Sequence, residues 1–583
     1  MIKKKFRQML LTQILSAMTV TICMMIDSIM IGRFLGVDSM AAYGLASPVL
    51  LVFAALGAMI SAGIQVVCGK TMGSGDEEGT NACYTVSILM ALVIAAAALL
   101  LVFVVPNQLC MILGAGKPSP DNQVFWLTKD YLTGFIVGAP AFLFAQLMVP
   151  YVQVTGQQNR LIAAVLVMTV TDVGLDLVNV FMIKGGMLGM GLASSVSYYV
   201  ALAIGLTYFL SKKCIFRFRP GKADRKTAVE LLRNGIPTVI NQVSLVLMVY
   251  LFNQILLGVG GNLSVAAYSV ISTISNICYS FGSGVAAVAL TLSSIFYVDE
   301  DRTSLLTLVR IMTNYAVVID LAVTVLVLMT APFLVGLFLT KPEAKDLAVL
   351  GLRLFSLCLI PCSLNTSFKN FYQGTDRTHL TEMISVLQNF LLPVLYAFLF
   401  SRFLGTTGVW MAFVCGETTA FVILSCLVWH RSGKFTVTAE AYAMLRSEIG
   451  EAAKDCFEAT VFSKEDVENA SIAVSEFCKA RGEGDRMSYY VALCVEEMAN
   501  NIVDYGFTKD KKEHSIDIRY MKKNGEHILR IRDDCEHFDP LAYLELYSSE
   551  DRAAHIGIRM VMGMVKDARY INSLGLNNLS LIF

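Results

Sequence analysis

The stretch TVTICMMIDSIMIGRFLG, residues 19–36, places one acid inside an apolar run. Asp27 is the only charged residue between Arg7 and Arg33. This interval can cross a lipid bilayer, because a transmembrane helix needs about 20 apolar residues that each rise roughly 1.5 Å. A carboxylate at membrane depth costs about 2.5 kcal/mol or more, so such residues are rare and usually functional. Asp27 therefore predicts a proton or cation site inside a transporter; the alternative is a buried aspartate whose hydrogen bonds neighbouring helices satisfy.

The composition divides the chain into a membrane part and a polar tail. Of its 583 residues, 55% are hydrophobic and 16% are charged, and the mean hydropathy is +0.61. These values are too apolar for a soluble protein of this length and indicate several membrane spans. From about residue 435 onward charged residues are frequent and no long apolar run remains. The 14 cysteines are scattered, without the paired spacing of a zinc site or a disulfide framework.

Hydropathy predicts twelve spans, of which the first is uncleaved because its apolar run is long and lacks a small-residue cleavage site. Most Lys and Arg residues between the spans fall on the side that holds the N-terminus. The positive-inside rule then places both termini in the cytoplasm of a multi-pass protein of the cell (inner) membrane. The predicted spans are 9–31, 45–68, 84–106, 126–151, 161–183, 188–210, 235–258, 265–297, 311–331, 347–370, 380–401 and 408–430.

The two halves of the membrane part look repeated. VDSMAAYGLAS at 37–47 is similar to NLSVAAYSVIS at 262–272, after the first span of each half. Six spans per half give two parallel repeats, 1–215 and 225–432, related by an axis along the membrane normal. Transporters built in this way bind substrate between the halves and expose it alternately to the two sides. The predicted fold class is a membrane all-α protein of twelve transmembrane helices with a C-terminal cytoplasmic α+β domain.

Two further acids lie in the fifth predicted span, TVTDVGLDLVNVF at 169–181. Asp172 and Asp176 are four residues apart and therefore share one helical face. At roughly 1.5 Å per residue, Asp27 and Asp176 both fall in the outer half of the membrane, so a shared site is possible. Carboxylates held close together need a proton or a bound cation, which suits an ion-coupled carrier. Asp320 and Glu417 also lie within spans but have no obvious acidic partner.

Five stretches resemble the multidrug and toxic-compound extrusion (MATE) family of transporters. The resemblance implies alternating-access export of small organic cations in exchange for Na⁺ or H⁺. In one branch of that family, an Asp in span one joins an Asn/Asp pair in span five; these positions fall on Asp27, Asp172 and Asp176. Ser194 or Ser195 lies near a family hydroxyl in span six, and Asp172 stands where Asn is usual. The stretches are IDSIMIGRFLGVDSMAAYGLASPV, GIQVVCGKTMGSGDEEG, YVQVTGQQNR, DVGLDLVNVFMIKGGMLGMGLASS and LLRNGIPTVINQVSL.

The tail predicts a compact α+β layer at 453–583 after a linker helix at 433–452. A strand is expected around 456–461, followed by a helix opened by Ser463 with Asp466 three residues on. A helix over 489–507 precedes two strands, 515–523 and 527–534, with a hairpin turn at Asn524-Gly525. A helix over 556–571 and a last strand over 577–583 complete the layer.

Glu497 and Asn501 share a helical face in the stretch EEMANNIVDYGF, a spacing that also occurs on ordinary solvated helices. This stretch resembles the Asn box of histidine kinases and, more closely, of anti-sigma-factor serine kinases. The resemblance implies that Asn501 is a Mg²⁺ ligand, that Glu497 orients a water or acts as a base, and that Mg-ATP is the cofactor.

Two further stretches resemble the glycine boxes of the same ATP-binding domains. RDDCEHFDP places Asp533 where the adenine amino group is bound, and HIGIRMVMGMV places Gly557 where the backbone approaches the phosphates. Cys535, His537 and His555 stand where glycines are usual. Whether ATP is hydrolysed or only bound is left open.

The leading hypothesis is an ion-coupled exporter of organic cations with a nucleotide-binding regulatory tail. ATP is expected to bias transport rather than power it, because no Walker A loop is present. The alternative is a membrane sensor whose tail phosphorylates or sequesters a cytoplasmic regulatory protein. A lipid-precursor flippase would need a basic cavity. The predicted spans are poor in basic residues, with Arg353 and Lys369 as the exceptions, and this counts against a flippase. The expected partners are a cationic small molecule, membrane lipid and such a regulatory protein, but no nucleic acid.

Overall fold

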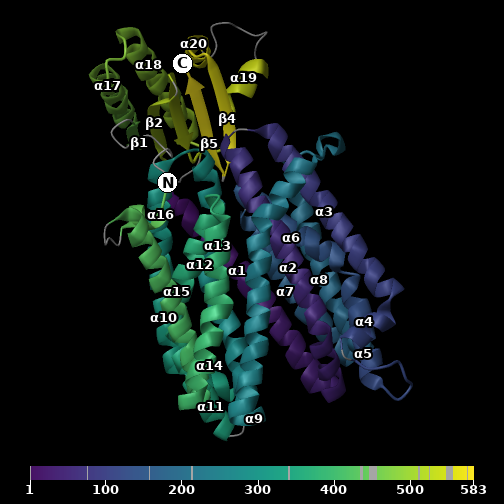
Figure 1. Cartoon of the computed structure of the whole chain (residues 1–583). Helices are drawn as coiled ribbons and strands as arrows, with labels where there is room; N and C mark the ends of the chain where they lie inside the picture. The colour runs from purple at the N-terminus through teal and green to yellow at the C-terminus, as the bar shows by residue number, and fades with distance from the viewer. Residues whose placement is uncertain are drawn as a thin grey trace.

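Two helical lobes lie side by side, and a domain with a β-sheet covers one end of them (Figure 1). The computed structural model describes residues 2–74, 76–113, 115–156, 158–211, 214–338, 342–433, 438–445, 456–509, 513–523, 525–546, 556–573 and 575–583.

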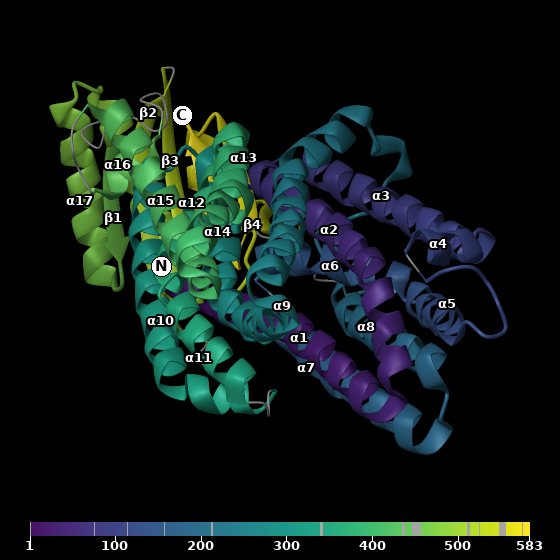
Figure 2. The same ribbon diagram turned by 60° about the horizontal axis from the view of Figure 1, so that its bottom comes forward.

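The first lobe contains the helices before residue 210. Asp76 and Asn122 cap α3 and α5, because their side chains accept from backbone N–H groups of the first turn. α5 and α6 meet at 47° near Gly138, where a proline enters the first turn of α6. The bounds are α1 Ile2–Met30, α2 Val37–Ser74, α3 Glu77–Val104, α4 Pro106–Ile112, α5 Gln123–Ile136, α6 Ala139–Val154, α7 Gln158–Val178 and α8 Gly186–Phe209. Figure 2 shows α1 running diagonally beside α7.

The second lobe begins with the long α9, which contains two spans. Gly261 breaks it with a φ of 61°, a value that glycine adopts without steric cost. α11 and α12 form a second bent pair, at 48°. The bounds are α9 Arg225–Val298, α10 Arg302–Gly336, α11 Pro342–Ser356, α12 Leu359–Gly374, α13 Thr378–Val386, α14 Leu392–Leu404 and α15 Thr406–Ser432.

Among the described residues, 10 helices are long and apolar enough to cross a membrane, or up to 12 spans if each bent pair counts as one. This range agrees with the predicted twelve-span fold. The bends inside the fourth and tenth spans were not predicted.

The lobes meet at the end that carries the tail. Lys70 of α2 pairs with Asp376, which follows α12. Ser294 of α9 donates to the Gln65 carbonyl of α2 at 2.9 Å. A Cβ on Gly73 would lie 2.8 Å from the Ile295 carbonyl oxygen, so the two backbones touch there. These contacts close the tail-side end of the interface between the lobes.

The tail is a five-stranded antiparallel sheet of order β1-β2-β3-β5-β4, with helices packed on one face. Ser463 and Asp466 form the predicted cap of α17: Ser463 Oγ accepts from Asp466 N–H, and Asp466 Oδ2 accepts from Phe462 N–H. The bounds are β1 Cys456–Val461, α17 Lys464–Ala480, α18 Asp485–Asn501, β2 Ile516–Lys523, β3 Glu526–Asp533, α19 Pro540–Leu546, α20 Ile556–Met564, β4 Asp567–Ser573 and β5 Leu576–Ile582.

One predicted helix is shorter in the structure, and a second is described only in part. The helix expected over 556–571 ends at Met564, and the rest of that stretch forms β4, which pairs with β5 along its length. Within the described residues, the linker helix expected over 433–452 contains α16, Ala439–Ala443, which ends at Met444, whose φ is 46°. Tyr442 holds α16 on the second lobe, with its hydroxyl 2.7 Å from Ser425 Oγ. Positions 446–455 lie outside the described residues.

Candidate functional site

Three aspartates meet in the first lobe. Asp27 of α1 and Asp172 and Asp176 of α7 have exposed fractions of 7%, 3% and 0%. The two α7 carboxylates are the negative groups that act most strongly on Asp27. Within the described residues, Asp27 Oδ1, Asp172 Oδ1 and both Asp176 oxygens lack a hydrogen-bond donor. The structure therefore brings the three predicted acids together, with open acceptor positions.

The two candidate serines of α8 lie in different environments. Ser194 Oγ donates to Asp27 Oδ2 at 3.4 Å. Ser195 Oγ instead donates to the carbonyls of Gly134 and Phe135 on α5, at 2.7 and 3.0 Å. Ser194 thus belongs to the acid cluster, whereas Ser195 ties α8 to α5.

Both helices that carry the acids continue as π-helical turns directly after the cluster. These turns are η1 (Ile31–Leu35) after α1 and η2 (Asn179–Ile183) after α7. Asn179 closes the second turn by accepting from Gly185 N–H and donating to the Gly186 carbonyl, each at 3.1 Å. A Cβ at Gly189 would overlap the Asn179 side chain, so this close approach requires glycine. π-turns are frequent at functional sites.

The two buried acids of the second lobe differ in their polar contacts, because Asp320 Oδ2 has no hydrogen-bond partner among the described residues whereas Glu417 has two. Glu417 accepts from Asn365 at 3.0 Å and from Gln388 at 3.3 Å. Lys369 donates to Asn241 at 2.5 Å. Asp320 is 1% exposed. No group of three or more His, Cys, Asp or Glu side chains in the described part of the chain could hold a metal ion.

A cavity of about 410 Å³ lies on the side of the second lobe that faces α2. Aromatic side chains form much of its wall: Tyr268, Tyr279, Phe355 and Phe413. Asp320 and Lys369 also line it. The cavity can take a small aromatic or aliphatic molecule, and it is separate from the three aspartates, which do not line it.

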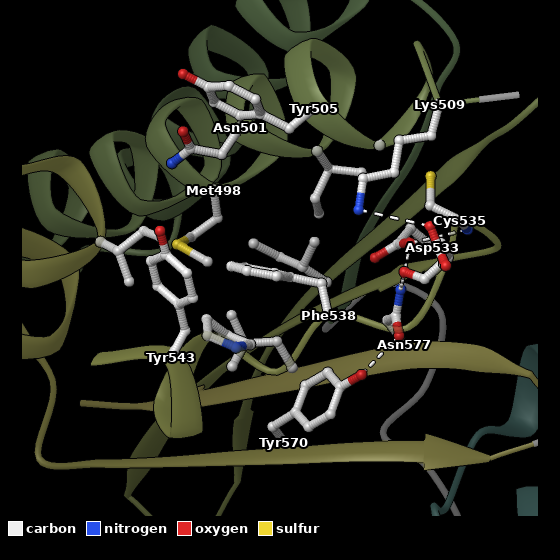
Figure 3. Close-up of a pocket in the computed structure, with 17 residues that line it drawn as sticks. Met498, Asn501, Tyr505, Lys509, Asp533, Cys535, Phe538, Tyr543, Tyr570 and Asn577 are labelled. Carbon is white, nitrogen blue, oxygen red and sulfur yellow. Dashed lines mark hydrogen bonds and ion pairs between the residues drawn. The ribbon is translucent and has the colours of Figure 1, made fainter. Parts of the chain in front are cut away.

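A second cavity, of about 320 Å³, lies in the tail between α18 and the sheet (Figure 3). Asp533, at the end of β3, is 4% exposed and points into it. Asn577 Nδ2 and Cys535 N–H both donate to Asp533 Oδ1, at 2.8 and 3.0 Å. Burial raises the pKa of Asp533, and these two hydrogen bonds oppose that rise. A fixed, buried acceptor at one end of an apolar cavity fits an amino group on a flat ring.

The other end of this cavity is formed by α18. Asn501 lines it, and Glu497 lies one turn earlier on the same helix. A Cβ on Gly557 would be 2.2 Å from Glu497 Oε2 and 3.8 Å from Asn501 Nδ2. Three of the predicted nucleotide-site residues therefore lie together beside the cavity.

Two residues that stand where glycines are usual, Cys535 and His537, do not fill the cavity. Cys535 packs on Gly506, where an added Cβ would be 2.9 Å from its Sγ, and His537 stacks edge-on against Tyr570. His555 lies outside the described residues. The lining fits Mg-ATP: Asp533 would accept from the adenine amino group, Ile531 and Leu579 line the space between, and Asn501 would meet the metal and the phosphates.

Several residues that line this cavity were not predicted. Asn577, which orients Asp533, read only as part of a final strand, although two consecutive asparagines are unusual in a buried strand. Lys509, Phe538 and Tyr543 also line the cavity (Figure 3). Lys509 and Tyr543 come from segments outside the recognised boxes, whereas Phe538 lies within RDDCEHFDP but was not predicted as a site residue.

Two family models match the chain. The MatE model matches residues 13–178 and 237–399, and a histidine kinase-like ATPase domain model matches residues 441–583. The chain is 22% identical to multidrug export protein MepA of Staphylococcus saprophyticus, over 69% of this chain and 88% of that protein. It is also 22% identical to the probable multidrug resistance protein YoeA of Bacillus subtilis, over 71% of this chain and 90% of that protein.

Solved structures agree in fold with the two lobes. A MATE protein in complex with MaL6 matches with a TM-score of 0.69 and 20% identity, over 76% of this chain and 98% of that one. An outward-facing multidrug resistance MATE transporter matches equally well, over 97% of its own length.

Proposed function

The chain belongs to the MatE family of transporters, and on that premise we propose that it exports organic cations in exchange for Na⁺ or H⁺ under the control of a nucleotide-binding tail. Export proceeds by alternating access between the lobes. The tail binds Mg-ATP and changes the rate of transport without supplying its energy.

The observation that carries the ion coupling is the cluster of Asp27, Asp172 and Asp176. Three carboxylates buried together cannot all stay ionised without a bound cation, and in its absence at least one of them takes up a proton. Four of their six oxygens have no donor in the described structure, so they are available to a proton. As they stand, the described side chains do not form a ready-made metal site, so Na⁺ binding would require the three carboxylates to draw closer together. Uptake of the ion on one side of the membrane and its release on the other supplies the driving force.

The cavity of the second lobe supports an organic cation as the exported molecule. Its aromatic wall favours flat or apolar groups, and rings attract cations over their faces. Asp320 supplies a carboxyl group to this wall, and Lys369 also lines the cavity. The curated relatives are named as multidrug exporters, which agrees with a cavity of broad selectivity.

The tail cavity supports ATP binding. Asp533 would accept from the adenine amino group, and Asn501 would ligate Mg²⁺ beside the phosphates. Bound Mg²⁺ would neutralise phosphate charge. The full-length protein should therefore bind Mg-ATP, and Asn501→Ala should lose that binding, whereas Asn500→Ala, which alters the neighbouring amide outside the cavity lining, should keep it.

Transport is tested in proteoliposomes with a fluorescent organic cation. A Na⁺ gradient and a pH gradient are imposed separately, and the gradient that drives export identifies the ion. Asp27→Asn should abolish coupled export while the protein still inserts and purifies as a single species. Asp130→Asn is the matched control, because it makes the same chemical change at an exposed position of the same lobe. Normal coupled export by Asp27→Asn would overturn the assignment.

A further inference from the structure

One face of the tail sheet carries three arginines. In β2 and β3 successive side chains point to opposite faces, and Ile518 and Ile531 belong to the tail core. The alternate positions Arg519, Arg530 and Arg532 lie on the other face. Their exposed fractions are nevertheless only 7–8%, so this basic face is covered.

The cover is an acidic turn of the second lobe, between α9 and α10. Asp299 Oδ2 accepts from Arg530 at 2.8 Å and from Arg532 at 2.7 Å. Asp301 Oδ1 lies 2.8 Å from Arg519 Nη1. Burial alone would raise the pKa of Asp301, but the three arginines hold it below its usual range. This five-residue group, the arginine anchor, fixes the tail to the second lobe.

A second contact joins the tail to the start of α1. Lys4 Nζ lies 2.7 Å from Asp534 Oδ2 and donates to the Glu513 carbonyl at 3.1 Å. Asp534 also accepts from Ser515 N–H at 2.9 Å. The Asp534 side chain is 3% exposed and that of Lys4 is 38% exposed. This pair is thus more open to water than the arginine anchor, and it is the weaker of the two attachments.

The second contact lies next to the nucleotide cavity. Asp534 follows Asp533 directly in the chain, so the group that pairs with Lys4 and the group that faces the adenine position are consecutive. A cavity of about 840 Å³ between the tail and the lobes is lined by Lys4 and Asp534. It shares Lys509 and Cys535 with the nucleotide cavity.

The helix that contains Lys4, α1, also contains Asp27 of the proposed ion site. α1 is continuous from Ile2 to Met30, so Lys4 and Asp27 lie on one rigid element, about 35 Å apart at 1.5 Å per residue. Phe6 and Met9 near its start pack in the core of the second lobe, whereas Met30 at its end packs in the core of the first. A displacement of the start of α1 is therefore transmitted toward the first lobe.

We propose that the Lys4–Asp534 contact is the surface through which a bound adenine nucleotide acts on transport, with the tail held on the second lobe by the arginine anchor. The proposal rests on the proposed nucleotide binding by the tail. Nucleotide bound at Asp533 shifts the segment that follows it. The ion pair between Asp534 and Lys4 then changes, and α1 moves relative to the anchored tail.

The test compares three variants of the full-length protein in proteoliposomes. Lys4→Ala removes the contact, Lys4→Arg keeps the charge and can pair with Asp534, and Lys3→Ala removes an equal charge at the neighbouring, exposed position. Export is measured with and without Mg-ATP on the face that carries the tail. Mg-ATP affinity is measured separately on each purified variant by calorimetry.

In Lys4→Ala we expect Mg-ATP affinity within threefold of the wild type but no dependence of export on Mg-ATP. Lys4→Arg and Lys3→Ala should keep that dependence. An unchanged dependence in Lys4→Ala, with binding intact, would overturn the role of this contact. Absence of Mg-ATP binding by the wild type would instead overturn the proposed regulatory function, so the two failures are distinguishable.

Discussion

Replacing Asn577 by leucine tests whether Asp533 selects adenine. Asn577 donates to Asp533 Oδ1 at 2.8 Å and to the Glu536 carbonyl at 3.0 Å. Its own oxygen accepts from Tyr570 at 2.6 Å. Leucine has a similar volume but makes none of these bonds, so the variant frees the Asp533 carboxylate to turn without enlarging the cavity.

The expected loss of unfolding free energy follows from the polar groups that lose Asn577 as a hydrogen-bond partner. A buried polar group that loses its partner costs about 1–3 kcal/mol. Asp533 keeps the Cys535 N–H bond, so the penalty falls mainly on Tyr570 and the Glu536 carbonyl, and the tail should lose about 2–4 kcal/mol of unfolding free energy. Loss of about 1.4 kcal/mol from the adenine contact lowers ATP affinity tenfold.

The assay is competitive binding of ATP and GTP to the full-length protein, because guanine carries an oxygen where adenine carries the amino group. In the wild type Asp533 should favour ATP, and in Asn577→Leu the ATP-to-GTP preference should fall about tenfold. Tyr570→Phe, which removes one bond on the far side of Asn577, should leave the preference intact. A variant that is less stable but keeps the wild-type preference would refute the assigned role of Asn577.

Three further predictions concern other parts of the chain. Because burial raises the pKa of Asp533 and the ionised carboxylate accepts from adenine more strongly than the protonated group, ATP affinity should be constant at high pH and fall by up to about tenfold per unit as the pH drops below that raised pKa; Asp533→Asn should flatten the profile. Asp301→Asn removes the nearer carboxylate of the buried Arg519, which keeps only Glu458 at 3.5 Å, a loss of up to about 3–5 kcal/mol, so limited proteolysis between residues 433 and 456 should release the tail at least tenfold faster than in the wild type; equal cleavage rates would contradict the anchor. Ser195→Ala should lower thermal stability by about 1–2 kcal/mol without changing the driving ion, whereas Ser194→Ala should alter the ion concentration at half-maximal export and leave stability nearly unchanged.

The membrane fold was predictable because each span is a local property of the chain. Apolar length sets a helix, and the 3.6-residue period places Asp172 and Asp176 on one face. An isolated acid such as Asp27 stands out because the cost of burying charge is large. The meeting of all three acids required only that their spans be neighbours.

The parts that were not predicted depend on pairing between distant residues. The segment Asp567–Ser573 follows α20 without a break in composition, and only its ladder with β5 makes it a strand. Arg530 and Arg532 occupy alternate positions of β3, a pattern that is common for exposed residues of a strand. Their partner Asp299 lies more than 200 residues earlier, and nothing near the arginines in sequence indicates it. Local patterns carry no information on such partners.

The contact between Lys4 and Asp534 spans 530 residues of sequence. During synthesis at about 5–20 residues per second, roughly half a minute to two minutes separate the synthesis of Lys4 from that of Asp534. During that interval the helices of the membrane lobes are synthesised and leave the ribosome. The sheet that contacts the start of α1 is completed only afterwards. Each newly made molecule therefore passes through a stage in which the membrane lobes have been made but the tail proposed to regulate them has not, and a chain truncated before the tail would remain at that stage.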